Sequence, residues 1–435
     1  MFKIVQLSLV KDKLTTKFMR NTSWLLFEQI FKMVLTLIVT SLMARYLGTH
    51  DFGLINYGLS YIIVFTTISN LGIDSIIVNE IIKNKDRTGT LIGTTILLRL
   101  ISSVISIFLI YVIVKYLNAD AFTLNVIIMI QSISLLFIIF DSIQYWFQSN
   151  LQSKYVVISK SVAFTIVSIW RLVLIFTEKS ISFFAFATVL EAFIISLLII
   201  VFYIRFKGPK LYFSFQTAKN LLLHARSYFI AGVLIMVYTQ IDKIMLGQLV
   251  DATTVGIYSA ALTIASLWMF IPNAIINSAR PIIMALNNEN KHVYIKKNKQ
   301  LYCSIIWIGI VASIFITLFS KSIVLLIYGD QFVESVDILV ILIWSRIFAL
   351  IGSVKAIWLT VENLGRYQVY FVGIAALINV VLNFILIPKY GATGAAISTL
   401  FAEVISALFT MLLFKKTRPL FKLIVEAFLF KGIRE

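Results

Sequence analysis

The chain is a succession of long apolar runs separated by short polar connections, from Trp24 to Phe414. Each run has about 20 residues or more, the length that an α-helix needs to cross a hydrocarbon core roughly 30 Å thick. The pattern predicts an all-α polytopic membrane protein with twelve transmembrane helices. One run is unusually long and contains Pro272 and Pro281, which predict a bend. The expected spans are 24–46, 54–81, 90–114, 122–147, 155–177, 181–204, 222–246, 255–285, 301–320, 335–360, 367–387 and 394–414.

Lysine and arginine are distributed unevenly over the connections. The N-terminal segment, the even-numbered loops and the C-terminal segment carry 24 of the 38 basic residues, whereas the odd-numbered loops carry five. Basic residues accumulate on the cytoplasmic side of membrane proteins. The distribution therefore predicts a multi-pass plasma-membrane protein with both termini in the cytoplasm. The basic segment 415–435 is expected to form an amphipathic helix on the inner membrane surface.

Composition excludes several other classes of protein. With 60% apolar residues and a mean hydropathy of +0.95, the chain is not an ordinary soluble domain. The net charge of +18 lies mostly beside the apolar runs, so it predicts membrane orientation rather than nucleic-acid binding. One cysteine and three scattered histidines predict no disulfide and no metal site. Because no P-loop and no nucleophile–base set is present, we expect no cofactor and no enzymatic activity.

The two halves of the chain resemble each other. Residues 185–198 match residues 396–409, and both copies belong to the last span of a six-span half. Six spans are an even number, so the copies are expected to have the same orientation, as in transporters built from parallel repeats. A shared pattern also joins the first two spans of each half, at Leu47, Gly48, Gly53 and Tyr57 and at Leu246, Gly247, Gly256 and Tyr258.

The repeat divides the chain into five expected parts. Two six-helix bundles are separated by a cytoplasmic linker and flanked by two amphipathic segments. The parts are the N-terminus 1–22, the first bundle 23–206, the linker 207–221, the second bundle 222–414 and the basic tail 415–435.

Three stretches carry a family resemblance. They are ARYLGTHDFGLINYGLSYIIVFTTISNLGIDSIIVNEI (44–81), IDKIMLGQLVDATTVGIYSAALTIASLWMFIPNAI (241–275) and PKYGATGAAISTLFAEVISAL (388–408). They resemble the polysaccharide biosynthesis and export family, which comprises Wzx-type flippases for lipid-linked O-antigen or capsule repeat units. That family lies within the multidrug/oligosaccharidyl-lipid/polysaccharide exporter superfamily. The resemblance covers most of residues 15–415 in the expected order.

The resemblance implies a fold and a function. The fold would be two six-helix bundles around a central cavity that opens to either side of a bacterial plasma membrane. The function would be to move undecaprenyl-diphosphate-linked oligosaccharides from the cytoplasmic to the outer face, by alternating access and coupled to an ion gradient. The expected partners are this polyprenyl-diphosphate-linked oligosaccharide, membrane lipids, and the polymerase and other proteins of polysaccharide assembly.

Ionisable residues inside the spans are the candidates for binding. A charge inside the bilayer is costly, so it normally faces a polar cavity or a partner. Basic residues outnumber acidic residues inside the spans, a balance that suits an anion such as a diphosphate. Arginine matches phosphate oxygens with a forked pair of donors. The candidate diphosphate ligands are Lys32, Arg99, Arg171, Arg280, Arg346 and Lys355.

The acidic residues are candidates for ion coupling, because a carboxyl group in a partly dry cavity is able to exchange a cation. Glu191 and Glu403 occupy similar places in the two repeats. A simpler interpretation is that these carboxylates neutralise arginines on neighbouring helices. The coupling candidates are Asp74, Asp141, Glu191, Asp242 and Glu403.

Three other functions stay open. A multidrug or cation antiporter of the same superfamily would favour an acidic cavity, whereas the spans here are net basic. A membrane polysaccharide polymerase or ligase would carry a sizeable periplasmic loop, whereas every odd-numbered loop here is short. A lipid II flippase is usually longer, with additional C-terminal spans.

Overall fold

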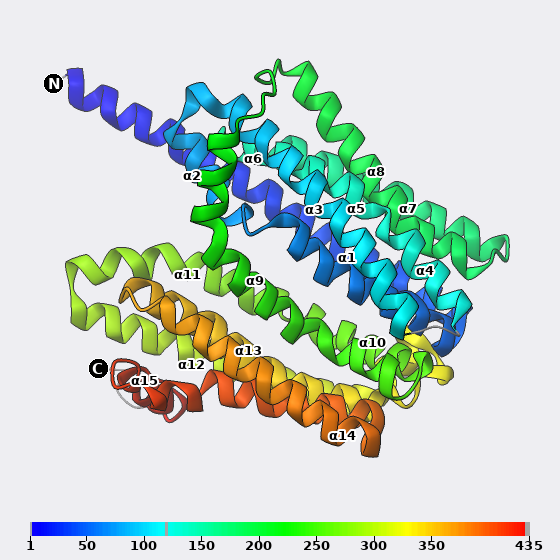
Figure 1. Ribbon diagram of the computed structural model, residues 1–435. Helices are drawn as coiled ribbons and strands as arrows, with labels where there is room; N and C mark the ends of the chain where they lie inside the picture. The colour runs from blue at the N-terminus through cyan, green and yellow to red at the C-terminus, as the bar shows by residue number, and fades with distance from the viewer. Residues whose placement is uncertain (1, 118–120, 431–435) are drawn as a thin grey trace. The chain divides into compact units, whose positions relative to one another are not determined.

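A computed structural model describes the fold of residues 2–117 and 121–430 (Figure 1). The side chains of residues 2–22, 25–26 and 287–289 are not described. The amphipathic character expected of residues 1–22, and the expected tail residues 431–435, therefore lie outside the described part. The helices are α1 (Phe2–Asn70), α2 (Asp74–Lys83), η1 (Lys85–Arg87), α3 (Thr88–Leu117), α4 (Phe122–Ser132), α5 (Ser134–Ile138), η2 (Ile139–Ile143), α6 (Gln144–Ser149), α7 (Ser153–Phe176), α8 (Ile181–Arg205), α9 (Phe215–Leu249), α10 (Ala252–Leu267), α11 (Phe270–Glu289), α12 (Lys291–Tyr328), η3 (Asp330–Phe332), α13 (Ser335–Val361), α14 (Arg366–Ala407), η4 (Phe409–Leu413) and α15 (Arg418–Phe428).

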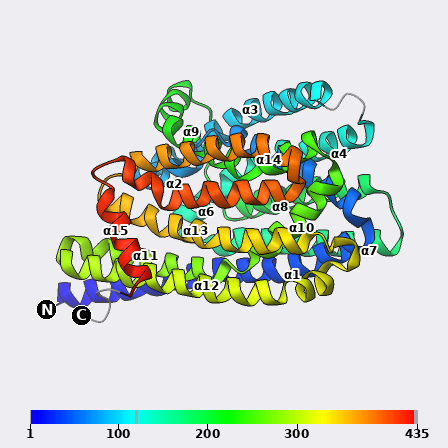
Figure 2. The same cartoon turned by 90° about the horizontal axis from the view of Figure 1, so that it is seen from below.

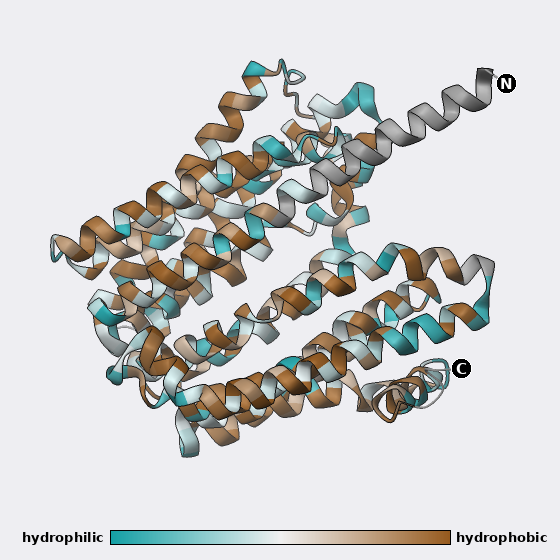
Figure 3. Ribbon diagram, turned by 180° about the vertical axis from the view of Figure 1, so that it is seen from behind, coloured by the Kyte–Doolittle hydropathy of each residue, from teal (hydrophilic) through white to brown (hydrophobic). Residues whose placement is uncertain are grey.

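The described residues form long apolar helices. Nine of them are long and apolar enough to cross a membrane, or ten when α10 and α11 count as one bent span. Two of these, Phe27–Lys83 and Arg366–Leu413, have 57 and 48 residues, enough for two crossings each. Counted in this way the described residues contain twelve spans, which agrees with the predicted fold class. Figure 3 shows apolar residues along most of each long helix and hydrophilic residues mainly near the helix ends.

Glycines with positive φ divide the two longest helices. Gly48 has a φ of 73° within α1, and Gly391 has a φ of 54° within α14. Side chains with a Cβ are strained in this region of backbone space, and glycine is not. The chain therefore turns at Gly48 between the first two spans and at Gly391 between the last two.

The predicted bend of the eighth span is confirmed. Helices α10 and α11 meet at an angle of 44° across Trp268 and Met269. Pro272 lies four residues after Trp268. Its ring would clash with the carbonyl of residue 268 in a continuous helix, and it has no N–H to donate. The break consequently falls one turn before Pro272, while Pro281 lies inside α11.

The described chain divides into two compact units. Unit 1 contains the described residues up to Tyr46 together with Gly58–Val233, and unit 2 contains Leu47–Tyr57 and the described residues from Leu234 onward. A buried apolar cluster in unit 1 joins α2, α3, α6, α7, α8 and the start of α9. In unit 2 a larger cluster joins α11, α12, α13, α14, η4 and α15. Figure 2 shows α15 lying across α12, with which it packs.

The two copies of the repeated glycine–tyrosine pattern touch each other within unit 2. A Cβ at Gly53 would lie 1.8 Å from the backbone oxygen of Ala252, and one at Gly256 would lie 2.0 Å from that of Thr49. The two backbones are therefore packed directly against each other. Close by, the Gln248 amide donates a hydrogen bond of 2.6 Å to the hydroxyl of Tyr57.

Candidate functional site

A polar pocket of about 420 Å³ lies inside unit 1, among α1, α5, η2 and α8. Lys32, Asp141 and Glu191, three of the residues selected from the sequence, line it together with Thr66 and Ser134. The Lys32 ammonium is 3.9 Å from a Glu191 oxygen, and its side chain is 57% exposed. At that separation the ion pair is loose. Lys32 therefore has hydrogen-bond donors left for an anionic ligand.

Arg99 lies in a separate buried network of unit 1. Its guanidinium forms an ion pair with Asp74 and donates a hydrogen bond of 3.1 Å to the Ser142 hydroxyl. Tyr145 donates to the same Asp74 carboxylate at 2.7 Å, and its ring lies 5.6 Å from the Arg99 guanidinium carbon. Arg99 is only 1% exposed. The network joins α2, α3, η2 and α6, and Arg99 and Asp74 do not line the unit 1 pocket.

We expect the Arg99–Asp74 pair to act mainly on stability. Arg99→Leu alone should lower the free energy of unfolding by about 1–3 kcal/mol, because Asp74 loses its cationic partner but is 38% exposed and keeps the hydrogen bond from Tyr145. The double variant Arg99→Leu/Asp74→Leu should recover most of that loss and retain transport. Thermal unfolding in detergent and a transport assay measure the two quantities. A double variant that is stable but inactive would instead assign Arg99 to substrate binding.

Arg171 lies on α7 of unit 1 and interacts electrostatically with Glu191 of α8. Its Nε atom is buried and has no hydrogen-bond partner. Glu191 is thus shared between Lys32 and Arg171. With Asp141, which lines the same pocket, the two cations and two carboxylates of this part of unit 1 balance in formal charge.

A second polar pocket, of about 230 Å³, lies inside unit 2 among α9, α10, α13 and α14. Asp242, Arg346 and Glu403, all selected from the sequence, line it with Tyr238 and Gln240. Within the described residues, two of its buried polar atoms have no hydrogen-bond partner: the Gln240 carbonyl oxygen and the Arg346 Nε. Buried polar atoms are normally paired with protein, water or a ligand. This pocket therefore has unused capacity to bind a polar group.

Asp242 is the most heavily hydrogen-bonded carboxylate of the unit 2 pocket. It is 5% exposed and accepts bonds from Tyr258 at 2.6 Å, from Asn383 at 2.7 Å and from Thr399 at 2.5 Å. Asn379 joins the cluster through the Asn383 side chain at 3.2 Å. The Asn383 carbonyl oxygen has no partner. Three protein donors thus point at the Asp242 carboxylate, so a cation that binds there takes the place of at least one of them.

Two further residues that were selected from the sequence, Lys355 and Arg280, line neither pocket. Lys355 is 1% exposed, donates to the backbone oxygen of Ser406 and lies 4.7 Å from the centre of the Phe371 ring. Arg280 is exposed on α11, immediately before Pro281. Glu403 interacts electrostatically with Lys355 as well as with Arg346.

The structure thus gathers six of the eleven selected residues into two pockets, one in each unit. Glu191 and Glu403, from matching helices of the two repeats, line one pocket each. The neutral residues of the unit 2 pocket, and those of the hydrogen-bonded cluster around Asp242, were not identified from the sequence. The one available signal was the spacing of Asn379 and Asn383, because residues four apart share a helix face. The missed residues are Tyr238, Gln240, Tyr258, Asn379, Asn383 and Thr399.

The pockets are suited to binding rather than to covalent chemistry. Among the described residues, no group of three or more His, Cys, Asp or Glu side chains could hold a metal ion. Each pocket combines a basic residue with two carboxylates. Such an arrangement is able to hold an anionic group on the base and exchange a cation at a carboxylate.

Three curated relatives of the chain are described as flippases or transporters. A Shigella flexneri protein described as an O-antigen transporter is 23% identical over 415 residues, which cover 91% of this chain and 97% of that protein. The flippase AglR of Haloferax volcanii is 28% identical over 181 residues, 40% of this chain. The matched part spans only 37% of the length of AglR and 40% of that of a second Haloferax flippase, Agl15.

Solved structures with the same fold are transporters of the two-lobe type. The lipid II flippase MurJ in an inward closed conformation has a TM-score of 0.76 at 16% identity, covering 93% of this chain and 89% of that one. An inward-facing multidrug transporter of the MATE family has a TM-score of 0.67 at 14% identity, covering 92% and 99%.

Family membership rests on the sequence itself. Residues 228–385 match the MatE family. A longer match, over more than half of the chain, extends from residue 18 to residue 287. That match is to the polysaccharide biosynthesis protein family, and the chain belongs to this family.

Proposed function

We propose that this protein is a flippase that moves undecaprenyl-diphosphate-linked oligosaccharides across the plasma membrane for O-antigen or capsule synthesis. The oligosaccharide passes from the cytoplasmic to the outer face, and both termini lie in the cytoplasm. No bond is made or broken. The substrate site is exposed to one side of the membrane at a time, and an ion gradient gives the cycle its direction.

The observation that carries this proposal is the pair of polar pockets inside otherwise apolar bundles. Charged side chains in a membrane domain are retained where they face a ligand or an ion pathway. Within the described residues, Lys32 of unit 1 forms only a loose ion pair at 3.9 Å, and the Arg346 Nε of unit 2 has no hydrogen-bond partner. A diphosphate presents several oxygens, so each of these cations, in its own pocket, is suited to binding phosphate oxygens. Family membership and the flippases among the relatives support a lipid-linked glycan as the cargo.

The second part of the proposal concerns ion coupling. We assign the coupling cation, a proton or Na⁺, to Asp242 of the unit 2 pocket. Glu403 lies in the same pocket and interacts electrostatically with both Asp242 and Arg346. A cation bound at Asp242 therefore also alters the electrostatic potential at Arg346. Binding of the cation and binding of the anionic head group are thereby linked through neighbouring charges.

Flipping by purified protein in liposomes tests the substrate assignment. With a fluorescent polyprenyl-diphosphate saccharide, Lys32→Gln and Arg346→Gln should each slow flipping by about tenfold, the effect of losing one charge-assisted hydrogen bond. The control is Arg366→Gln, which removes an exposed charge outside both pockets and should leave the rate unchanged. Equal rates in all three variants would refute the role of these two cations in binding.

Export of organic cations is a second candidate. The unit 2 pocket contains two carboxylates and one base, a balance that also suits a cationic drug. The same liposomes distinguish the two functions. A drug exporter would move a cationic dye against an imposed gradient and would not accelerate movement of the lipid-linked saccharide.

A further inference from the structure

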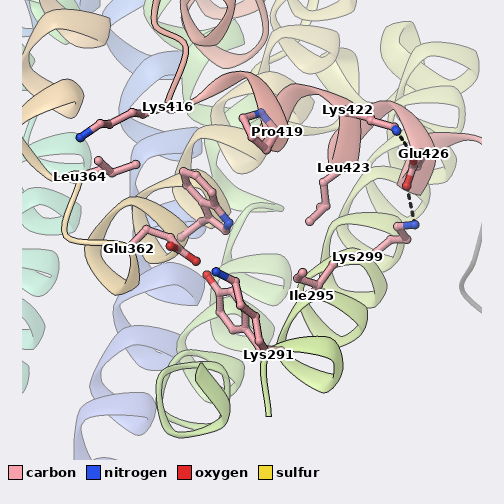
Figure 4. A pocket seen from close by; sticks show the side chains of 12 residues that line it. Lys291, Ile295, Lys299, Glu362, Leu364, Lys416, Pro419, Lys422, Leu423 and Glu426 are labelled. Atoms are coloured by element: carbon pink, nitrogen blue, oxygen red, sulfur yellow. Dashed lines mark hydrogen bonds and ion pairs between the residues drawn. The ribbon is translucent and has the colours of Figure 1, made fainter. Parts of the chain in front are cut away.

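A third pocket lies in unit 2, outside both polar pockets described above, and has a volume of about 580 Å³. The start of α12, the end of α13, the connection to α14 and the C-terminal helix α15 form its walls (Figure 4). Figure 4 shows Lys291 and Glu362 on one side of this pocket and Lys422 and Glu426 on the other. We call it the α15 pocket.

The charges of the α15 pocket are unbalanced. Four lysines and two glutamates line it, which leaves a formal charge of two positive. Glu426 is held by Lys299 at 2.6 Å and by Lys422 at 3.9 Å. Neither Lys291 nor Lys416 forms an ion pair within the described part of the chain. The electrostatic field therefore favours an anion with one or two negative charges.

A buried hydroxyl gives an independent sign of a ligand. Tyr294 lines the α15 pocket and is 0% exposed. Its hydroxyl lies near the Asn298 and Glu362 side chains, yet within the described residues it forms no hydrogen bond of normal geometry. A buried hydroxyl without a partner costs free energy, and such groups are normally satisfied. An acceptor oxygen inside the pocket would satisfy it. Phosphate oxygens accept hydrogen bonds from both hydroxyl and ammonium donors.

The rest of the pocket is apolar and continues onto an apolar surface. Ile295, Trp358 and Leu423 line it between the charged groups. On α15 the outward-facing Val425 and Phe428 are 40% and 47% exposed. The main apolar side of α15 packs on the protein through Leu420 and Ile424, so Val425 and Phe428 form a smaller exposed apolar strip that is available to acyl chains. A ligand with a phosphate group and hydrocarbon chains matches both parts of this surface.

We propose that the α15 pocket binds the head group of an anionic phospholipid from the leaflet at which α15 lies. Lys291, Lys416 and the Tyr294 hydroxyl hold the phosphate, and the acyl chains run along the exposed apolar side of α15. A lipid with a net negative charge, such as phosphatidylglycerol, offsets part of the excess positive charge of the pocket. Phosphatidylcholine, whose head group adds a positive charge, does not.

Lipid binding to purified, delipidated protein tests the proposal and needs no transport. Native mass spectrometry during titration with phosphatidylglycerol or phosphatidylcholine gives the affinity for each lipid. We expect phosphatidylglycerol to bind about tenfold more tightly than phosphatidylcholine, because each basic residue near the head group adds to its affinity. Lys291→Gln/Lys416→Gln should remove that preference. Tyr294→Phe, which deletes only the hydroxyl, should weaken binding of phosphatidylglycerol without changing the folded state.

The matched control is Lys296→Gln/Lys297→Gln, which removes two lysines of α12 that do not line the pocket. This variant should keep the full preference for phosphatidylglycerol. A preference that both double variants lose equally would reflect the general charge of the segment and would overturn the proposal. Competition with inorganic phosphate distinguishes the source of the anion. If phosphate alone displaces the lipid at equal concentration, the site binds a free phosphate compound and the lipid assignment is wrong.

Discussion

Asp242→Asn is expected to abolish gradient-driven transport, lowering its rate by about 100-fold or more. Asp242 accepts three hydrogen bonds, from Tyr258, Asn383 and Thr399, and an amide places a donor where an acceptor is needed. Losing several hydrogen bonds to a charged group costs a few kcal/mol, and this free energy corresponds to a rate about 100-fold lower. The measurement is flipping in liposomes with an imposed proton or Na⁺ gradient.

The control for this prediction is Asp337→Asn, which neutralises an exposed carboxylate at the start of α13 and should transport normally. Thermal unfolding separates loss of coupling from loss of structure. If Na⁺ is the coupling ion, it should raise the melting temperature of the native protein but not that of Asp242→Asn, because a ligand stabilises only the state that binds it. An Asp242→Asn protein whose flipping still follows the imposed gradient would show that the coupling residue is elsewhere.

Gly53→Ala and Gly256→Ala are each expected to destabilise unit 2 by about 3 kcal/mol, which is at the upper end of the cost of overpacking. The added methyl group would overlap a backbone oxygen, at 1.8 Å for residue 53 and 2.0 Å for residue 256. Backbone atoms, unlike side chains, have no alternative rotamer that would relieve this overlap. The segment around Gly53 and the segment around Gly256 therefore have to separate. Thermal unfolding of the purified protein in detergent measures the loss.

Gly352→Ala provides the matched control, because a Cβ at this helical position meets nothing within 4 Å. It should be neutral or stabilising by up to about 1 kcal/mol, the difference in helix propensity. The double variant Gly53→Ala/Gly256→Ala should cost less than the sum of its parts, since one separation accommodates both methyl groups. Unchanged unfolding in Gly53→Ala would contradict the close packing of Leu47–Tyr57 on α10.

Selection of charged residues within the spans identified part of the binding machinery. Lys32, Asp141, Glu191, Asp242, Arg346 and Glu403 stand out in apolar runs because a charge there needs a partner or a cavity, and all six line one of the two pockets. The same rule also selected Lys355 and Arg99, whose charges are met by a backbone oxygen and by Asp74. A charged residue in an apolar run indicates that some group in the fold interacts favourably with the charge. It does not indicate whether that group is a ligand, a side chain or the backbone.

The twelve spans and the bend before Pro272 were determined by the sequence alone, because the thickness of the bilayer and the geometry of proline act on local stretches of chain. The Asp242 cluster was decided by tertiary structure. Asn383 and Thr399 lie 141 and 157 residues from Asp242, and neutral side chains give no signal in a hydropathy pattern. The contact between Gly53 and Gly256 is of the same kind. Such contacts depend on how helices pack, and packing is set by the shapes of surfaces formed only once the helices exist.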